Sequence, residues 1–448
     1  MVVVGGGFAG LAAAVRLGRG GARVTVLERR PFLGGRAYSF TDPVTGDVID
    51  NGPHALMGAY TEAFDFLDEI GARAKLAVQP RLHVAMAHPT DGVAAVAAPA
   101  LPGPLQAPAA LLRYRLLSRG DRIRLVGGAL RLVARAARGP RALAGVTVAA
   151  ALADAGQSAA SRARFWDPLA IATLNEDPTR AAAAPFAAVI RRAFFAGAGA
   201  ARFALAAVPL SALYTTDAER AIVTAGGAVC TAAAVETLTL AGGRVAGLVL
   251  RDGTRVDADA VVLAVPCGAL LRLLPPALRA APPFQALDDV GTSPIVSVHL
   301  WLDRPVGWGA PFLGLLATRA QWLFDCGPAA DGGHRVATVT SGARAWEDAA
   351  DADIVAEVVA DAGAVLPALR AATVRRALVV RERHATISLT PAADAVRPAA
   401  ETPISNLLLA GDWTRTGLPA TIEGAVQSGR TAAAAALRAV TRAGASPV

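Results

Sequence analysis

VVVGGGFAGLAAAVRLG (residues 2–18) decides the fold of this chain, because it places a strand, a glycine-rich turn and a helix in immediate succession. Residues 2–4 are β-branched and apolar, which is typical of a buried parallel strand. The GxGxxG pattern of residues 5–10 permits a tight turn and lets the backbone at a helix N-terminus approach a pyrophosphate. A second apolar strand at residues 23–27 ends at Glu28, whose carboxylate can accept both hydroxyls of a ribose. This order of elements predicts a dinucleotide-binding unit.

The composition indicates a large folded protein without a nucleic-acid-binding pattern. The chain has 448 residues, of which 54% are hydrophobic and 18% are charged, so it can bury more than one core. The sequence shows neither a signal peptide nor an apolar run of the about 18 residues that a transmembrane helix needs. Its formal charge of +8 comes with no zinc-finger, helix-turn-helix or RNP pattern, so we expect no nucleic-acid partner. Cys230, Cys267 and Cys326 form no disulfide framework, which favours a reducing, cytoplasmic location.

A second strand–glycine–helix pattern lies near the other end of the sequence. Residues 407–409 are apolar and precede Gly411 and Asp412, and a helix is expected from residue 421 toward residue 440. The first turns of this helix carry small residues, which permit a helix N-terminus to approach a ligand closely. The chain therefore contains two segments suited to holding a cofactor, nearly four hundred residues apart.

Several motifs resemble the flavin amine oxidase and carotenoid desaturase superfamily. They are the Gly-Gly-Arg at residues 34–36, the segment at residues 48–54, the strand region at residues 226–236 and the motif that follows residue 410. This resemblance implies FAD rather than a nicotinamide, clamped by the two distant segments, and no cysteine or histidine stands where a covalent flavin link is expected, so we expect it to be non-covalent. The residues expected to contact FAD are Gly5, Gly7, Phe8, Ala9, Gly10, Glu28, Arg29, Gly35, Arg36, Asn51, Gly52, His54, Val235, Gly411, Asp412, Thr421 and Ile422.

Longer matches narrow the resemblance to the hydroxysqualene dehydroxylase family, also described as squalene-associated FAD-dependent desaturases. The matching stretches are DNGPHALMGAY (50–60), RFWDPL (164–169) with TLN (173–175), VPLSAL (208–213), and GDWT with GLPATIEGA (411–425). Two positions depart from the expected pattern: Pro53 stands where the family usually has glutamine, and Arg415 stands where an acidic residue is expected.

The resemblance implies an oxidoreductase that acts on a long-chain isoprenoid. In that family reduced FAD delivers a hydride to hydroxysqualene, and the hydroxyl group leaves as water to give squalene, in squalene and hopanoid biosynthesis. Hydroxide is a poor leaving group, so the reaction needs an acid. His54 is the first candidate, with Glu423 and His384 second, and the alternative that His54 only orients the cofactor stays open. No pattern of metal ligands accompanies them.

Two other functions remain alternatives at this point. A carotenoid or phytoene-type desaturase would share the cofactor and the apolar substrate. An amine oxidase fits less well, because flavin amine oxidases generally use an aromatic pair and often a lysine near the flavin. Here all four tyrosines precede residue 215, residues 418–420 are not aromatic, and Lys75 is the only lysine.

The predicted fold class is α/β. A Rossmann-like FAD-binding domain of the GR2 type is expected from residues 1–80, 220–270 and 400–448, interleaved with a mixed α+β substrate-binding domain from residues 81–219 and 271–399. Within the second domain, alternating patterns predict strands at residues 296–302 and 336–340, and a helix at residues 352–366.

Residues 109–141 carry nine arginines and one aspartate among many aliphatic residues. A basic and apolar helix or helix pair of this kind is typical of a segment that docks on the surface of a membrane. We therefore expect peripheral contact with the inner face of the cell membrane through this segment. The alternative is an ordinary amphipathic helix with a solvated basic face, and the sequence does not predict an oligomeric state.

Overall fold

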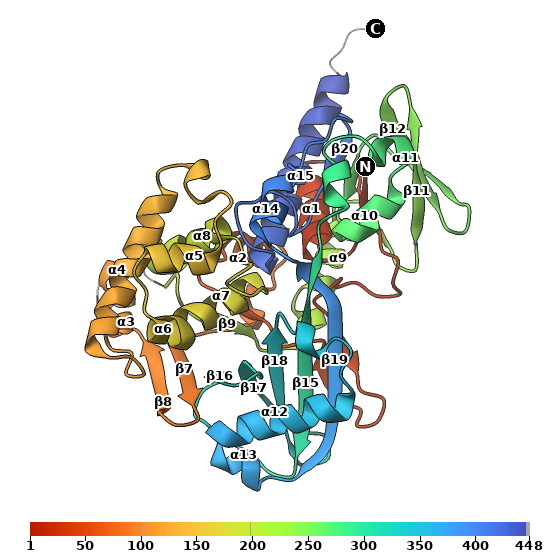
Figure 1. The fold of residues 1–448 in the computed structure, drawn as a ribbon. Helices are drawn as coiled ribbons and strands as arrows, with labels where there is room; N and C mark the ends of the chain where they lie inside the picture. The colour runs from red at the N-terminus through yellow and green to blue at the C-terminus, as the bar shows by residue number, and fades with distance from the viewer. Residues whose placement is uncertain (102, 198, 445–448) are drawn as a thin grey trace.

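A five-stranded parallel sheet forms the core of one half of the molecule. The computed structural model describes residues 1–444 except 102 and 198. The strand order is β10-β2-β1-β14-β20, and Val2 pairs with both Thr25 and Val261 in parallel register. The strands are β1 (Val2–Val4), β2 (Thr25–Leu27), β10 (Ala228–Cys230), β14 (Val261–Leu263) and β20 (Leu407–Leu409). Segments from three distant parts of the sequence thus form one sheet (Figure 1).

Both faces of this sheet are covered, as its uninterrupted apolar strands require. Val3 and Leu408 face a layer made by helices α1 (Phe8–Arg19), α9 (Leu210–Thr224) and α15 (Ile422–Gly444). The residues that alternate with these along the strands point to the other face of the sheet, which is covered by an antiparallel sheet and a helix. These elements are β11 (Val235–Ala241), β12 (Arg244–Leu250), β13 (Arg255–Asp257) and α10 (Cys267–Leu273). Helices α1 and α15 lie against each other, with α1 over β1 and β2 and α15 over β14 and β20 (Figure 1).

A seven-stranded mixed sheet forms the other half, in the order β19-β15-β18-β17-β16-β7-β8. Helix α12 (Asp351–Val365) covers one face and packs on Val296, Val298 and Leu300 of β15. The intervening residues of β15 point to the opposite face, toward the parallel-sheet half. The strands are β7 (His83–His88), β8 (Gly92–Ala97), β15 (Thr292–Leu302), β16 (Phe312–Leu315), β17 (Trp322–Pro328), β18 (His334–Ser341) and β19 (Val374–Ile387).

A group of helices lies beside the seven-stranded sheet (orange to yellow in Figure 1). Asn175 ends α7 in the left-handed conformation, and its amide bonds the Ser293 carbonyl (3.1 Å) and the Thr386 hydroxyl (2.9 Å). This asparagine therefore fastens the helices to the sheet. The helices are α3 (Gly103–Leu112), α4 (Arg119–Ala136), α5 (Val148–Asp154), α6 (Ala159–Ser161), α7 (Asp167–Leu174) and α8 (Ala183–Phe195). Among the residues described, no helix is both long and apolar enough to cross a bilayer.

The remaining elements connect these layers. Strand β9 pairs with β5 and β6, and α9 packs on α1, so the expected domain boundary at residues 219/220 falls within α9. The other domain boundaries that were predicted from the sequence stay predictions. The connecting elements are β3 (Ser39–Thr41), β4 (Val48–Asp50), β5 (Ala55–Met57), α2 (Thr61–Glu69), β6 (Leu76–Val78), β9 (Phe203–Ala206), α11 (Pro276–Arg279), α13 (Pro367–Ala371) and α14 (Pro391–Val396).

The contact between α1 and α15 depends on a glycine. A Cβ atom at Gly429 would lie 2.1 Å from the Ala9 carbonyl oxygen, whereas a Cβ atom at Gly127 of α4 would meet nothing within 4 Å. We predict that Gly429→Ala lowers the free energy of unfolding by about 3 kcal/mol, because the helices must separate. Gly127→Ala, the matched control, should raise it by about 0.5–1 kcal/mol. Melting temperatures of both variants test this, and equal melting temperatures would contradict the predicted packing.

Candidate functional site

The first part of the site is the turn between β1 and α1. A Cβ atom at Gly10 would lie 1.9 Å from the Gly5 carbonyl oxygen, so the tight turn requires glycine. Glu28, at the end of β2, is buried, and its carboxylate accepts hydrogen bonds from the backbone N–H of Gly6 (2.7 Å) and of Arg30 (2.9 Å). No described side chain caps the N-terminus of α1, so its first N–H groups are available to an anion. This geometry fits the phosphate and ribose of a dinucleotide.

The second part is the Gly-Gly-Arg turn, which lies against the first. A Cβ atom at Gly35 would lie 3.0 Å from the Gly7 Cα, so the two glycine-rich turns are in close contact. Arg36 donates hydrogen bonds to the Asp412 carboxylate (2.6 Å) and to the Ala385 carbonyl (2.7 Å). The guanidinium thus joins the N-terminal cradle to the motif that follows β20.

The third part is the loop between β20 and α15. Arg397 is buried beneath it and donates hydrogen bonds to the backbone carbonyls of Asp412 (2.9 Å) and Leu418 (2.7 Å). The Thr421 hydroxyl accepts from the Gly424 N–H (3.3 Å) and so caps α15. The loop is therefore fixed at both of its ends. Three glycine-bearing turns, the acids Glu28 and Asp412 and the arginine Arg36 together form a continuous cradle of the kind that a flavin dinucleotide needs.

The segment after β4 leads from this cradle to a cavity. The Asn51 side chain donates hydrogen bonds to the Arg36 carbonyl (3.0 Å) and to the Glu382 carboxylate (2.9 Å). A Cβ atom at Gly52 would lie 2.6 Å from the Ser297 hydroxyl, so this backbone packs directly on β15. Residues 51 and 52 therefore lie between the cofactor cradle and the seven-stranded sheet.

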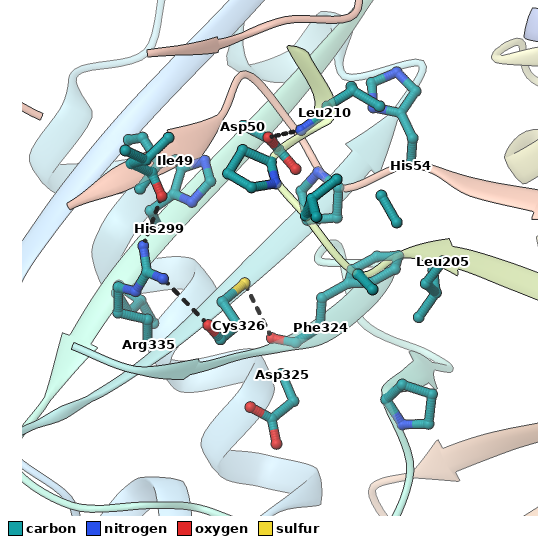
Figure 2. A pocket seen from close by; sticks show the side chains of 18 of the residues that line it. Ile49, Asp50, His54, Leu205, Leu210, His299, Phe324, Asp325, Cys326 and Arg335 are labelled. Carbon is teal, nitrogen blue, oxygen red and sulfur yellow. Dashed lines mark hydrogen bonds between the residues drawn. The ribbon is translucent and has the colours of Figure 1, made fainter. Parts of the chain in front are cut away.

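A cavity of about 310 Å³ begins at this segment (Figure 2). Its walls come from β4 and the following loop, from the connection between β9 and α9, and from β15, β17 and β18. Most of the lining is apolar, as is typical of a small-molecule site. The lining residues are Val48, Ile49, Asp50, Pro53, His54, Leu205, Ala206, Ala207, Val208, Pro209, Leu210, His299, Leu300, Trp301, Pro311, Phe324, Asp325, Cys326 and Arg335.

Of the three predicted catalytic residues, only His54 lines this cavity. Its Nδ1 lies 2.7 Å from the Gly52 carbonyl oxygen, and burial lowers the pKa of its imidazole below the usual 6.5. The neutral ring then donates through Nδ1 and leaves Nε2 as an acceptor. Nε2 is therefore the nitrogen of His54 that is left for contact with a ligand.

Glu423 and His384 lie elsewhere. Glu423 is buried beside a smaller cavity, accepts from the Ala63 N–H (3.0 Å) at the start of α2, and pairs with Arg192 (3.0 Å). Burial raises the pKa of this carboxyl group. His384 is exposed on β19, 2.9 Å from the Thr292 hydroxyl. The structure does not bring these two residues together with His54.

Two other predicted cofactor contacts lie near Glu28. Arg29 is exposed, and it is Arg30 that turns inward and donates to the Gly35 carbonyl (2.9 Å). Val235 begins β11, two residues after Ala233, whose backbone N–H donates to the Glu28 carbonyl (2.9 Å). Glu382 and Arg397 were not predicted from the sequence, although both contact predicted cofactor residues. Within the part of the chain that the structure describes, no group of three metal-ligating side chains occurs.

Comparison with known proteins identifies the family. The family of flavin containing amine oxidoreductases matches residues 8–437. The chain belongs to this family. It is therefore a flavin-dependent oxidoreductase, as predicted, and the predicted fold class is confirmed. A solved putrescine oxidase variant has the same fold, with a TM-score of 0.73 at 18% identity over 97% of each chain.

Named relatives match over almost the whole chain. The sequence is 33% identical to a hydroxysqualene dehydroxylase of Rhodopseudomonas palustris, over 96% of both proteins. It is 26% identical to a 15-cis-phytoene desaturase of Synechococcus elongatus, over 97% of this chain and 95% of the relative. The predicted resemblance to hydroxysqualene dehydroxylases is thus confirmed at full length.

The ion pair between Arg36 and Asp412 yields a prediction for cofactor binding. Asp412→Ala leaves a partly buried guanidinium without its carboxylate and loosens the loop before α15, so we expect flavin to bind at least about tenfold more weakly. Asp348→Ala, at a carboxylate whose side chain is 92% exposed, should change nothing. Fluorescence titration of the flavin-free protein measures both affinities. Unchanged flavin affinity in Asp412→Ala would contradict this role.

Proposed function

We propose that this chain binds FAD non-covalently and converts hydroxysqualene into squalene. In this reaction the C–O bond of the alcohol breaks, the carbon gains a hydride, and the hydroxyl group leaves with a proton as water. The observation that carries the proposal is the 33% identity to a hydroxysqualene dehydroxylase over 96% of both chains. The mostly apolar cavity next to the cofactor cradle supports it, because the substrate is a hydrocarbon chain with one hydroxyl group.

The residues of the chain have distinct roles in this proposal. Glu28, Arg36 and Asp412 hold the dinucleotide, and the reduced flavin supplies the hydride when bound. The apolar walls at Leu205 and Phe324 exclude water, which would otherwise capture a reactive carbon centre. The protonated form of His54 would donate its Nε2 proton to the departing hydroxyl group.

The cavity lacks one feature of flavin amine oxidases. By the resemblance drawn from the sequence, those enzymes generally use an aromatic pair and often a lysine near the flavin. The described lining residues include Trp301 and Phe324 but no lysine. Lys75 instead donates to the Ala212 carbonyl (2.7 Å) and pairs with Asp217. A phytoene-type desaturase remains the second candidate, because a phytoene desaturase is 26% identical to this chain.

The reaction can be tested with the purified flavoprotein. We expect that anaerobically reduced protein mixed with hydroxysqualene in detergent forms squalene, with flavin reoxidation in the same proportion. Oxidised protein should form none, because no hydride is then available. Gas chromatography of the extract and flavin absorbance measure the two products. Dehydrogenation of phytoene by the oxidised protein, with no squalene from the reduced one, would instead establish the desaturase alternative.

The pH dependence of this reaction tests His54. Because burial lowers its pKa below 6.5, the imidazole is largely neutral at pH 7 and gains its second proton as the pH falls through the lowered pKa. The single-turnover rate should therefore rise toward acidic pH. His54→Gln should slow the reaction by about 10²–10⁴-fold and abolish the rise in rate toward acidic pH. A variant that keeps the wild-type profile would exclude His54 as the acid.

We also propose that α3 and α4 dock on an anionic membrane surface. Five large apolar side chains are exposed here: Leu101 39%, Leu105 54%, Leu112 46%, Ile123 67% and Leu130 52%. The same segment carries the exposed arginines Arg113, Arg115, Arg119, Arg124, Arg131, Arg138 and Arg141. Apolar insertion combined with arginine–phosphate attraction suits a surface rich in acidic lipids.

Flotation with liposomes tests this surface. We expect binding to vesicles that contain acidic phospholipid, and a loss of about 1 kcal/mol per charge removed in a triple variant of Arg113, Arg115 and Arg119 to glutamine. The matched control is the same change at three exposed arginines far from α3 and α4, Arg251, Arg255 and Arg272. Equal flotation of both triple variants would contradict docking through this surface.

A further inference from the structure

The polar groups that line the cavity have almost all found partners within the protein. The Asp50 carboxylate accepts a hydrogen bond from the Leu210 N–H (2.9 Å). Arg335 donates to the backbone carbonyls of Val48 (3.0 Å) and Cys326 (3.3 Å) (Figure 2). These groups therefore organise the walls, and a ligand gains little by contacting them.

His299 differs from these polar groups, because one of its ring nitrogens has no hydrogen-bond partner in the described part of the chain. It lies on β15, and its side chain shares the cavity-facing side of the sheet with Ser297 and Trp301. The residue is 6% exposed, and none of the residues that the structure describes gives its Nε2 atom a hydrogen-bond partner. The Nε atom of Arg335 also lacks a hydrogen bond, but the Asp47 carboxylate lies 3.8 Å away and offsets its charge.

The imidazole of His299 is neutral at physiological pH. Burial, together with the positive charge of Arg335, lowers its pKa to about 4. A neutral ring presents either one N–H or one lone pair at Nε2. A buried polar atom of this kind is costly to leave unpaired, so it favours ligands that can satisfy it.

We propose that His299 is the positioning residue that binds the hydroxyl group of a long-chain isoprenoid alcohol in this cavity, an inference that rests on the proposed function. A hydroxyl group both donates and accepts, so it pairs with Nε2 in either tautomer. The apolar chain on either side of the hydroxyl then contacts Trp301 and Phe324. His54 lines the same cavity, so the bound hydroxyl group would lie in a cavity that both histidines line.

This assignment also separates the two candidate substrates. A C30 alcohol satisfies Nε2, whereas a hydrocarbon such as phytoene or squalene leaves it unpaired. The cost of that unpaired atom gives a preference for the alcohol of about tenfold or more. Squalene, the product, would by the same reasoning bind more weakly than the substrate and leave the cavity.

Equilibrium binding to the oxidised holoprotein tests the inference. Trp301 lines the cavity, so its fluorescence can report binding of hydroxysqualene and of squalene in the same detergent. We expect His299→Leu to weaken hydroxysqualene binding at least about tenfold and to leave squalene binding within about threefold. His299→Gln, which retains a polar amide near the position of Nε2, should keep most of the preference. His83→Leu, at an exposed histidine of β7, should bind both ligands as the wild type does.

The outcomes distinguish this inference from the proposed function. If the wild-type protein forms squalene but His299→Leu keeps the full preference for the alcohol, His299 does not bind the hydroxyl group and only this inference fails. If His299→Leu weakens the binding of both ligands equally, His299 has a purely structural role, and again only this inference fails. If the wild-type protein binds no hydroxysqualene and forms no squalene, the proposed function itself fails. Should His299→Leu lose its flavin, His299→Phe carries the same expectation.

Discussion

The ion pair between Arg36 and Asp412 joins residues 376 positions apart, and the site depends on it. The same guanidinium bonds the Ala385 carbonyl on β19, so three remote parts of the sequence meet at one side chain. Charges of this kind are costly to remove from water, and a partner left alone is more costly still. The cradle therefore holds together only when the first turn, the seven-stranded sheet and the loop before α15 are all in place.

Strand β15 shows how one element can serve both the core and the site. Its apolar positions pack under α12, and the positions between them carry Ser297, His299 and Trp301 on the opposite face, where His299 and Trp301 line the cavity. Because successive side chains of a strand point to opposite faces of the sheet, one straight strand can fill both roles. Trp301 also donates from its ring N–H to the buried Asp47 carboxylate (2.7 Å), so this polar face is anchored rather than loosely solvated.

The elements with a strong local pattern were predictable from the sequence. Residues 2–28 and 407–429 carry strand, glycine and helix signals in order, and the predicted helix at residues 352–366 corresponds to α12. Glu382, Arg397 and His299 were not found, because their meaning comes from partners that are remote in sequence. The sequence does contain an indication for His299. It stands between the apolar residues Val298 and Leu300 of a predicted strand, so its side chain is expected on the face opposite to theirs. His54 and Glu423 were the first and a second candidate for the acid, and only the fold shows that Glu423 caps helix α2 whereas His54 lines the cavity.

The order of strands in the parallel sheet has a consequence for biogenesis. Strand β1 lies beside β14, and β14 beside β20, so the sheet cannot close until residues around 409 have left the ribosome. Until then, the early strands expose an unpaired edge, and α1 has no α15 to pack against. A nascent chain of this topology depends on being shielded from aggregation during synthesis, and it acquires its coenzyme only after most of the polypeptide has been made.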